Sequence, residues 1–433
     1  MLQDRKLGPV SLAALLLSTH YGMGFLLGTA EQAFTQGLAG SLYAVSLGLG
    51  TFGLMLIARF YWTRVDQIWT LLGDRYGQQT RVTIGVMSWV SMIGIGAAQI
   101  ISGTFILKVL GLPVLPSMVG LTLLIMLLSL LPMEKASWIY RSLLAVNFLA
   151  LVYALSALHG LGDYGRSPLE FLPALEHMKP AQTLGIFLST VLLIQVDMNC
   201  QQFLVQAKNL RSLYWGCILA ALMLLALAMV PSVLVNTAQS AGILPPGLDG
   251  KETIPYILTW LGGGVGRPVG MALVAALLVP ALGTGSSVLR IQTKTTLDFW
   301  PLLPNEQANR WLWAGLNGLI CLAIALKASS IITLIVCFYA VYVAAVCVPF
   351  VAFLLDQVGY TFSASSLRLG LFMGSATALA ILVLSLVTPQ WLAFGSPELN
   401  IMIFGLGAGF LGLLGSQLVE MVFSTPTQAK EEI

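Results

Sequence analysis

The sequence predicts an all-α polytopic membrane protein with about twelve transmembrane helices. Of its 433 residues, 57% are hydrophobic and only 9% are charged, whereas a soluble domain carries about 25% charged residues. The mean hydropathy of the chain is +0.88. A water-soluble protein cannot bury that much apolar surface, so we expect the lipid bilayer to be the solvent for most of the chain.

Twelve apolar runs are long enough to cross a membrane, because a transmembrane helix needs about 20 predominantly apolar residues. The segments between these runs are too short to hold a soluble domain. The spans are expected at Val10–Phe34, Leu38–Ile57, Val82–Val109, Leu115–Leu131, Ala136–Leu158, Leu184–Val205, Tyr214–Val235, Pro268–Ile291, Trp311–Leu326, Ser330–Leu354, Leu367–Val387 and Leu399–Val422.

The distribution of positive charge predicts the orientation of the chain. With the N-terminus in the cytoplasm, most of the 21 lysine and arginine residues fall in cytoplasmic segments, as the positive-inside rule requires. An even number of spans then places both termini in the cytoplasm, and we expect an integral protein of the inner (plasma) membrane. The net charge is only +3 and no block of like charge occurs, which excludes a nucleic-acid partner and leaves a protein partner open.

Two of the predicted spans are interrupted by polar residues and glycine. The first contains the run from His20 to Gln32, with three glycines, and the sixth contains the run from Gln195 to Gln202. Unwound backbone at membrane depth survives only where it lines a cavity. Because the broken spans stand five apart, we expect two inverted repeats, residues 10–160 and 161–357, each opening with a broken helix. Residues 1–9 and 358–433 lie outside the repeats.

Several polar side chains in these spans are candidates for function. Glu31 is the sharpest, because a charge at the bilayer centre costs about 2.5–3.5 kcal/mol; it could bind a cation, carry a proton, contact a substrate or cap amides freed at the break. The same cost applies to Asp197, which could cap the second half of the sixth span or gate the site. Gln99 and Gln202 could contact substrate or hydrogen-bond between helices. His20 is expected to be a buried neutral histidine rather than a proton carrier.

The five cysteines lie in apolar stretches, are odd in number and show no CxxC spacing. We therefore expect them to be buried small hydrophobic residues. The sequence also lacks metal-ligand spacings, a nucleophile elbow, a P-loop and a dinucleotide fingerprint in a suitable context. These observations predict a protein that is not an enzyme and that needs no organic cofactor.

The chain resembles the sodium:solute symporter family, whose members share the five-plus-five inverted repeat of the LeuT-like transporters. The resemblance rests on the order of four segments: the opening helix with its glycines, Arg75-Tyr76-Gly77, the stretch from Asp197 to Lys208, and the stretch from Ala275 to Asp298. It implies discontinuous helices 1 and 6. The chain departs from the family pattern at Phe203, where arginine is usual. We also expect it to lack the extra helix that precedes the first core helix in many members.

The resemblance implies a sodium site between the first and eighth core helices. Aligned on Gly37, it assigns the ion ligands to Leu27, Ala30, Pro280, Gly283 and Thr284. Gly283 departs from the pattern because glycine has no hydroxyl. The resemblance also makes Gln32 a sugar-contact candidate and places Tyr339 in a gating helix. The predicted substrate-binding residues are Glu31, Gln32, Gln99, Asp197, Gln202 and Tyr339.

These observations predict a secondary active transporter that couples sodium to the symport of a small organic solute by alternating access. One alternative is a proton-coupled symporter in which Glu31 carries the proton. Another is a non-transporting, symporter-like membrane subunit that senses a ligand or supports a partner protein. The sequence does not identify the solute.

Overall fold

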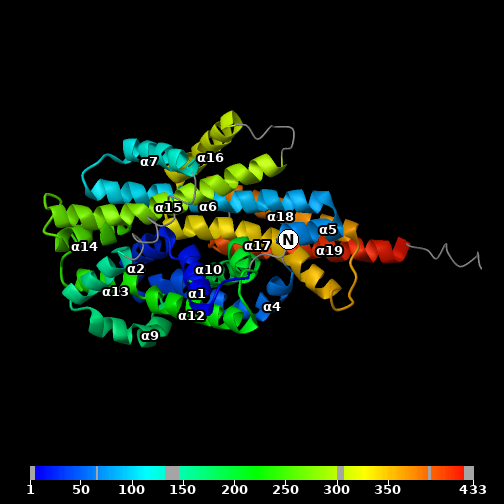
Figure 1. Cartoon of the computed structure of the whole chain (residues 1–433), viewed down its shortest axis with the longest axis horizontal. Helices are drawn as coiled ribbons and strands as arrows, with labels where there is room; N and C mark the ends of the chain where they lie inside the picture. The colour runs from blue at the N-terminus through cyan, green and yellow to red at the C-terminus, as the bar shows by residue number, and fades with distance from the viewer. Residues whose placement is uncertain (1–4, 65–66, 132–145, 300–306, 389–391, 424–433) are drawn as a thin grey trace, which may run out of the picture.

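The computed structural model describes residues 5–64, 67–131, 146–299, 307–388 and 392–423, and these residues form a helical bundle (Figure 1). Outside its helices, the described part of the chain has one isolated β-bridge, between Leu7 and Ala207. The α-helices are α1 (Pro9–His20), α2 (Thr29–Gln36), α3 (Leu42–Gly53), α4 (Met55–Thr63), α5 (Ile68–Tyr76), α6 (Gln78–Val109), α7 (Val114–Ser129), α9 (Leu161–Leu175), α10 (Pro180–Val196), α11 (Met198–Leu204), α12 (Leu210–Ala228), α13 (Val230–Ser240), α14 (Thr253–Leu261), α15 (Pro268–Phe299), α16 (Gln307–Lys327), α17 (Ile331–Asp356), α18 (Ala364–Val387) and α19 (Pro397–Phe423). A π-helical segment η1 (Gly24–Gly28) and two 3₁₀ segments, η2 (Gly37–Ser41) and η3 (Gly250–Glu252), complete the set.

The helices confirm a polytopic membrane protein. Among the described residues, seven helices are long and apolar enough to cross a membrane, or up to ten if each bent helix pair is one span. Large apolar side chains cover the outer surface, including Leu56 at 88% exposure and Leu169 at 81%. Only lipid makes so large an exposed apolar surface favourable. The total of twelve spans and the two repeat boundaries stay predictions, and the first part of the expected span Ala136–Leu158 lies outside the described residues.

Local sequence signals set several helix ends. Asn209 caps α12, because its side chain accepts a hydrogen bond from the Ser212 amide at 2.8 Å, and Ser363 caps α18 through the Ser366 amide at 2.9 Å. These side chains satisfy amides that have no partner within the first turn. Gly77 ends α5 with φ of +99°, a conformation that glycine adopts without strain.

The centre of the bundle is α17, which packs against α6, α10, α18 and α19 (Figure 1). Its approach to α6 is close, because a Cβ at Gly94 would lie 2.6 Å from the Cβ of Phe338. On its other side α6 packs along α15. With 32 residues, α6 is about 48 Å long, so it connects the two ends of the bundle.

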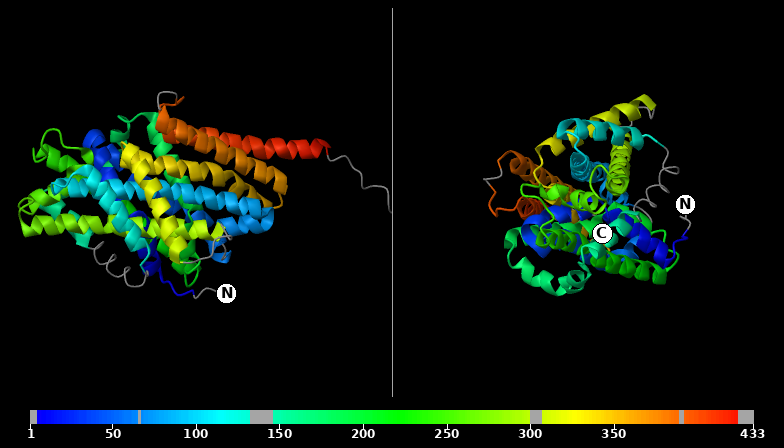
Figure 2. Two further views of the ribbon diagram at one scale, coloured as in Figure 1. Left: turned by 90° about the horizontal axis from the view of Figure 1, so that it is seen from above. Right: turned by 90° about the vertical axis from the view of Figure 1, so that its left-hand side faces the viewer.

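Helices α18 and α19 form a tightly packed pair along one edge of the bundle (Figure 2). Glycines at a spacing of four, Gly370 with Gly374 and Gly405 with Gly409, lie in this interface. A Cβ at Gly370 would lie 2.8 Å from the Gly409 carbonyl oxygen. Small residues at this spacing allow membrane helices to approach backbone to backbone.

We expect Gly370→Val to destabilise the protein by about 1–3 kcal/mol, because a backbone carbonyl cannot give way to the added side chain. The matched control is Gly407→Val on α19, where an added Cβ meets nothing within 4 Å. Thermal unfolding of both variants in detergent checks the prediction. Equal unfolding temperatures for the two variants would contradict the close approach of α18 and α19.

All five cysteines are free, and four of them are buried, with Cys347 half-buried. The expectation that the cysteines are buried small hydrophobic residues is therefore largely confirmed. The exception is Cys200, whose thiol contacts two polar side chains.

Candidate functional site

Two helices are broken where the sequence predicts breaks. Helix α1 ends at His20, the chain is non-helical at Tyr21 and Gly22, and the helical direction changes by 62° before η1. Helices α10 and α11 meet at Asp197 with a bend of 42°. Asp197 caps α11, because its Oδ1 accepts hydrogen bonds from the backbone amide of Asn199 at 3.0 Å and from the side-chain amide of Asn199 at 3.1 Å.

Two tyrosine hydroxyls donate hydrogen bonds to the backbone carbonyls that the second break leaves without helical partners. The hydroxyl of Tyr61 donates to the Gln195 carbonyl at 2.5 Å, and the hydroxyl of Tyr342 donates to the Val196 carbonyl at 3.3 Å. Tyr61 comes from α4 and Tyr342 from α17. The end of α10 is therefore held from two sides.

We expect Tyr61→Phe to lower stability by about 1–3 kcal/mol, because it leaves a buried carbonyl without a donor. Tyr360→Phe is the control, since Tyr360 is 66% exposed. Thermal unfolding in detergent is the measurement. A Tyr61→Phe protein as stable as the control would show that the Gln195 carbonyl does not need this donor.

One cavity joins the two breaks. It has a volume of about 640 Å³. Its wall includes His20 beside the first break, Asp197 at the second, and residues of α6, α15 and α17. The residues that line it are Thr19, His20, Gln67, Trp69, Thr70, Gln78, Arg81, Ser88, Ser91, Met92, Ile95, Leu193, Asp197, Met198, Asn199, Gln202, Ile291, Lys294, Thr295, Asp298, Tyr339 and Tyr342.

The cavity extends from one end of the bundle to its middle. Along α6 its lining residues run from Gln78, at the start of the helix, to Ile95, a rise of about 25 Å. Along α15 they are Ile291 to Asp298, at the end of that helix. Charged and polar side chains gather near this end, which is the cytoplasmic one in the predicted orientation.

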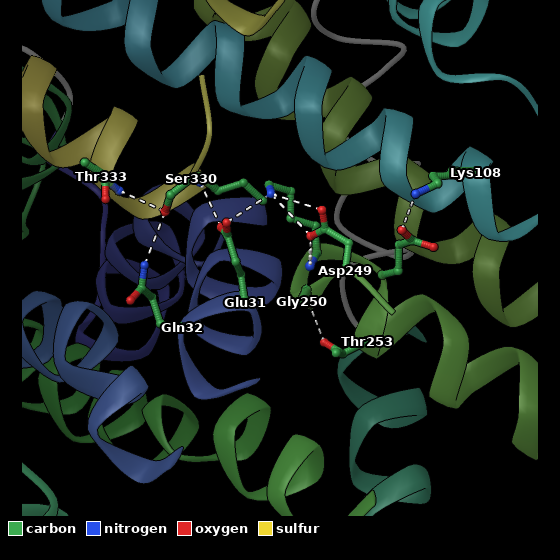
Figure 3. A network of polar contacts seen from close by, with 11 residues as sticks. Glu31, Gln32, Lys108, Asp249, Gly250, Thr253, Ser330 and Thr333 are labelled. Carbon is green, nitrogen blue, oxygen red and sulfur yellow. Dashed lines mark hydrogen bonds and ion pairs between the residues drawn. The ribbon is translucent and has the colours of Figure 1, made fainter. Parts of the chain in front are cut away.

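The opposite end of the bundle is closed by a network of ion pairs (Figure 3). The Nζ of Lys251, in η3, lies 3.2 Å from the Oε1 of Glu31, in α2. Both side chains are about one-tenth exposed. The second oxygen of Glu31 accepts a hydrogen bond from the backbone amide of Ile331 at 2.8 Å. Glu31 therefore joins three segments: α2, the loop that holds Lys251, and the first turn of α17.

Further contacts extend this closure (Figure 3). Lys108, near the end of α6, pairs with Glu252 at 2.5 Å. The Nε2 of Gln32 donates to the Ser330 hydroxyl at 3.2 Å. Lys251 also pairs with Asp249 at 3.3 Å. We call Glu31, Gln32, Lys108, Asp249, Lys251, Glu252 and Ser330 the polar latch.

The predicted ion-site residues are not all brought together. A Cβ at Gly22 would lie 3.9 Å from the Thr284 hydroxyl, so Thr284 faces the first break as expected. Leu27 and Ala30 lie beyond the break, in η1 and α2, and their assignment as ion ligands stays a prediction. Gly24 and Gly28 begin and end the π-helical segment η1, and a Cβ at Gly28 would lie 2.8 Å from Ile332 of α17.

The other predicted ligands lie within α15. Pro280, Gly283 and Thr284 are all inside this helix. Ser286, nearby on the same helix, is 3% exposed, and its hydroxyl donates to the Gly283 carbonyl at 3.1 Å. Thr284 is therefore the hydroxyl of the predicted set that α15 presents to the first break.

The predicted substrate residues divide into two groups. Asp197, Gln202 and Tyr339 line the cavity. Glu31 and Gln32 belong to the polar latch, and their role in substrate binding stays a prediction. Both lie in the first turn of α2, which follows η1 beyond the first break.

Gln99 lies outside the cavity lining. Its side chain, on α6, is 2% exposed and packs against Gly285 of α15. Its Oε1 atom has no hydrogen-bond partner among the described residues. A buried amide oxygen of this kind is costly to leave unpaired, so Gln99 stays a candidate for a contact made in another conformation.

The sequence patterns did not single out Tyr61, nor four charged residues of the latch, Lys108, Asp249, Lys251 and Glu252. The available signal for Lys251 was its setting in Asp249-Gly250-Lys251-Glu252, a charged turn between two apolar helices. Its partner Glu31 is 220 positions away, and no local pattern connects them.

Comparisons with known proteins find similar solved structures. No family model matches the chain, and no curated protein matches it. A Na⁺-coupled sialic acid symporter in a substrate-bound outward-open state is similar over 95% of this chain and 91% of its own, with a TM-score of 0.65 and 14% identity. Mhp1, a nucleobase-cation-symport-1 family transporter with bromovinylhydantoin bound, is similar over 98% and 95%, with a TM-score of 0.56 and 16% identity.

A third similar structure is MhsT in complex with L-phenylalanine, at a TM-score of 0.56 and 13% identity. The similarity covers 96% of this chain and all of MhsT. In each case the similarity runs through almost the whole chain. In the present chain, two broken helices meet at one cavity. The chain has the LeuT-like transporter fold.

Proposed function

We propose that this protein is a secondary active transporter that couples sodium to the symport of a small organic solute by alternating access. The observation that carries the proposal is the cavity between the two broken helices, open toward one end of the bundle while the polar latch closes the other. Alternating access requires a central site that faces one side of the membrane at a time. In this arrangement the cavity faces the predicted cytoplasmic side.

The solute would bind near Asp197, Gln202 and Tyr339, which line the cavity at the second break and on α17. The similar structures bind small organic molecules: the sialic acid symporter has its substrate bound, Mhp1 has bromovinylhydantoin bound, and MhsT is in complex with L-phenylalanine. They support this class of solute for the present chain.

The coupling sodium would lie between the first break and Thr284. The proximity of the Thr284 hydroxyl to Gly22 supports this position. The backbone at Tyr21 lies outside the helices, and backbone carbonyls are oxygen ligands that a hard cation prefers. No organic cofactor is expected.

The proton-coupled alternative depends on Glu31, and the sensor alternative on ligand binding without transport. Both stay predictions. Glu31 pairs with Lys251 at the closed end rather than lining the cavity, so a proton carried by Glu31 would have to be exchanged when the latch opens.

The test is thermal unfolding of the detergent-purified protein while sodium replaces choline at constant ionic strength. A ligand that binds only the native state stabilises it by mass action. Saturable stabilisation by sodium is the expected result. No sodium effect, together with a pH-dependent shift that Glu31→Gln removes, would instead establish the proton version, and neither effect would favour the sensor.

A further inference from the structure

Three potential metal ligands meet where the two broken helices touch. His20 is the last residue of α1, Asp197 lies at the second break, and Cys200 is in the first turn of α11. The Sγ of Cys200 lies 3.3 Å from the Nε2 of His20 and 3.6 Å from the Oδ2 of Asp197. The three ligand atoms all lie within 4.8 Å of one another.

The cluster is buried but borders the cavity. Cys200 is fully buried and His20 is 8% exposed. His20 and Asp197 also line the cavity wall. A small ion therefore has a path from solvent to the cluster, while a larger molecule would reach only its cavity face.

The separations fit a tetrahedral metal centre. Zinc binds histidine nitrogen at about 2.0–2.1 Å and cysteine sulfur at about 2.3 Å, so neighbouring ligand atoms of a tetrahedral site lie about 3.5 Å apart. The nitrogen–sulfur and sulfur–oxygen separations here lie on either side of that value, and the nitrogen and oxygen atoms lie within 4.8 Å of each other. An ion would thus need little movement of the surrounding helices.

Asp197 is already oriented for this role. Its Oδ1 is held by the backbone and side-chain amides of Asn199, which leaves Oδ2 directed toward Cys200. Such outer hydrogen bonds orient metal-binding carboxylates in many sites. Thiolate and imidazole together prefer borderline and soft divalent ions over sodium, magnesium or calcium.

We propose that His20, Asp197 and Cys200 bind a divalent transition-metal ion of the Zn²⁺ or Co²⁺ type, with a fourth position open to the cavity. As the metal–sulfur bond forms, the Cys200 thiol loses its proton to water in the cavity. The imidazole of His20 binds through Nε2 as the neutral ring. Three protein ligands and one open position are the arrangement of zinc sites that exchange a ligand.

The test uses the full-length, tag-free protein in detergent, titrated with Co²⁺. We expect one equivalent to bind with thiolate-to-cobalt charge-transfer absorption, and Zn²⁺ to displace it. Cys200→Ser should abolish this absorption. His20→Asn and Asp197→Asn should each weaken Co²⁺ binding by more than about 100-fold, beyond the 10–100-fold effect of losing an outer-shell partner.

Matched controls separate this site from other thiols and imidazoles. Cys217→Ser changes another buried cysteine and His177→Asn an exposed histidine, and both should bind Co²⁺ like the unaltered chain. Asp197→Asn preserves the helix cap, so it tests the site even if another variant does not fold. Absence of the charge-transfer absorption in the unaltered chain, or its persistence in Cys200→Ser, would overturn the proposal.

Discussion

Replacing Lys251 by methionine is expected to open the closed end of the molecule. The Lys251–Glu31 pair is about nine-tenths buried on both sides, and removing one partner of a buried pair costs about 3–5 kcal/mol because the other charge is left uncompensated. This cost falls on the conformation in which the latch is closed. The balance between closed and open forms should therefore shift by about 100-fold or more.

The shift can be measured by spin-label distances between Pro246 and Lys327, each replaced by cysteine in a background with Cys347→Ser. Pro246 lies in the loop before Lys251, and Lys327 ends α16, just before α17; both are exposed. We expect a longer distance to dominate in Lys251→Met. Lys179→Met, which removes another lysine that is exposed, should leave the distance unchanged.

The double variant Glu31→Gln with Lys251→Met shows whether opening results from the loss of the Glu31–Lys251 ion pair or from other effects of removing the lysine. It removes both charges, so the uncompensated carboxylate is gone and much of the closed population should return. If the double variant opened as far as Lys251→Met alone, the Glu31 contact would not be what holds the latch closed.

Replacing Thr284 by alanine is expected to raise the sodium concentration needed for half-maximal stabilisation by about 10–100-fold. The Thr284 hydroxyl faces the first break, and an interaction between such a group and a charge contributes about 1.5–3 kcal/mol. The other oxygen ligands would come from backbone carbonyls, which the substitution does not remove. Sodium binding should weaken without loss of the fold.

Ser286→Ala is the control for this prediction. Ser286 lies two residues away on the same helix, but its hydroxyl donates to the Gly283 carbonyl. Thermal unfolding with sodium replacing choline should give the same half-maximal concentration for Ser286→Ala and the unaltered chain. A Thr284→Ala protein that also behaved like the unaltered chain would place the ion elsewhere.

Much of the fold could be predicted because membrane helices follow from long apolar runs. The expected span Pro268–Ile291 begins where α15 begins, and the expected span Ser330–Leu354 begins one residue before α17. The two breaks were also predictable, since carboxylates, amides and glycines do not otherwise interrupt a span. Asp197 stands at the second break itself.

The glycines of the first span were harder to interpret, because glycine can mark either a break in a helix or a close contact between helices. Gly22 lies at the break, whereas Gly24 and Gly28 allow η1 to approach Ile335 and Ile332 of α17. Glycine relaxes the backbone, but it also permits close packing. Only the position of α17, some 300 residues later, distinguishes these two uses of glycine.

The side-chain partners could not be predicted, because they are distant in sequence. Glu31 lies 220 positions before Lys251, and His20 lies 180 positions before Cys200. Cys200 was expected to act as a small hydrophobic residue. Its apolar surroundings supported that interpretation, and only the junction of two broken helices brings an imidazole and a carboxylate to its thiol.

We expect the cavity between the breaks to face one side of the membrane at a time. The most direct measurement is labelling of Ser91→Cys with a membrane-impermeant maleimide, in intact cells and in inside-out vesicles, in a Cys347→Ser background. Ser91 lines the cavity. Ser102→Cys is the control, because Ser102 is fully buried farther along α6 and is not part of the cavity lining.

In the closed-latch protein we expect Ser91→Cys to react in inside-out vesicles and not in intact cells. Adding Lys251→Met should transfer the reaction to intact cells, because the opposite end then opens. Reaction from both sides in a single state, or labelling that Lys251→Met does not change, would contradict alternating access through this cavity.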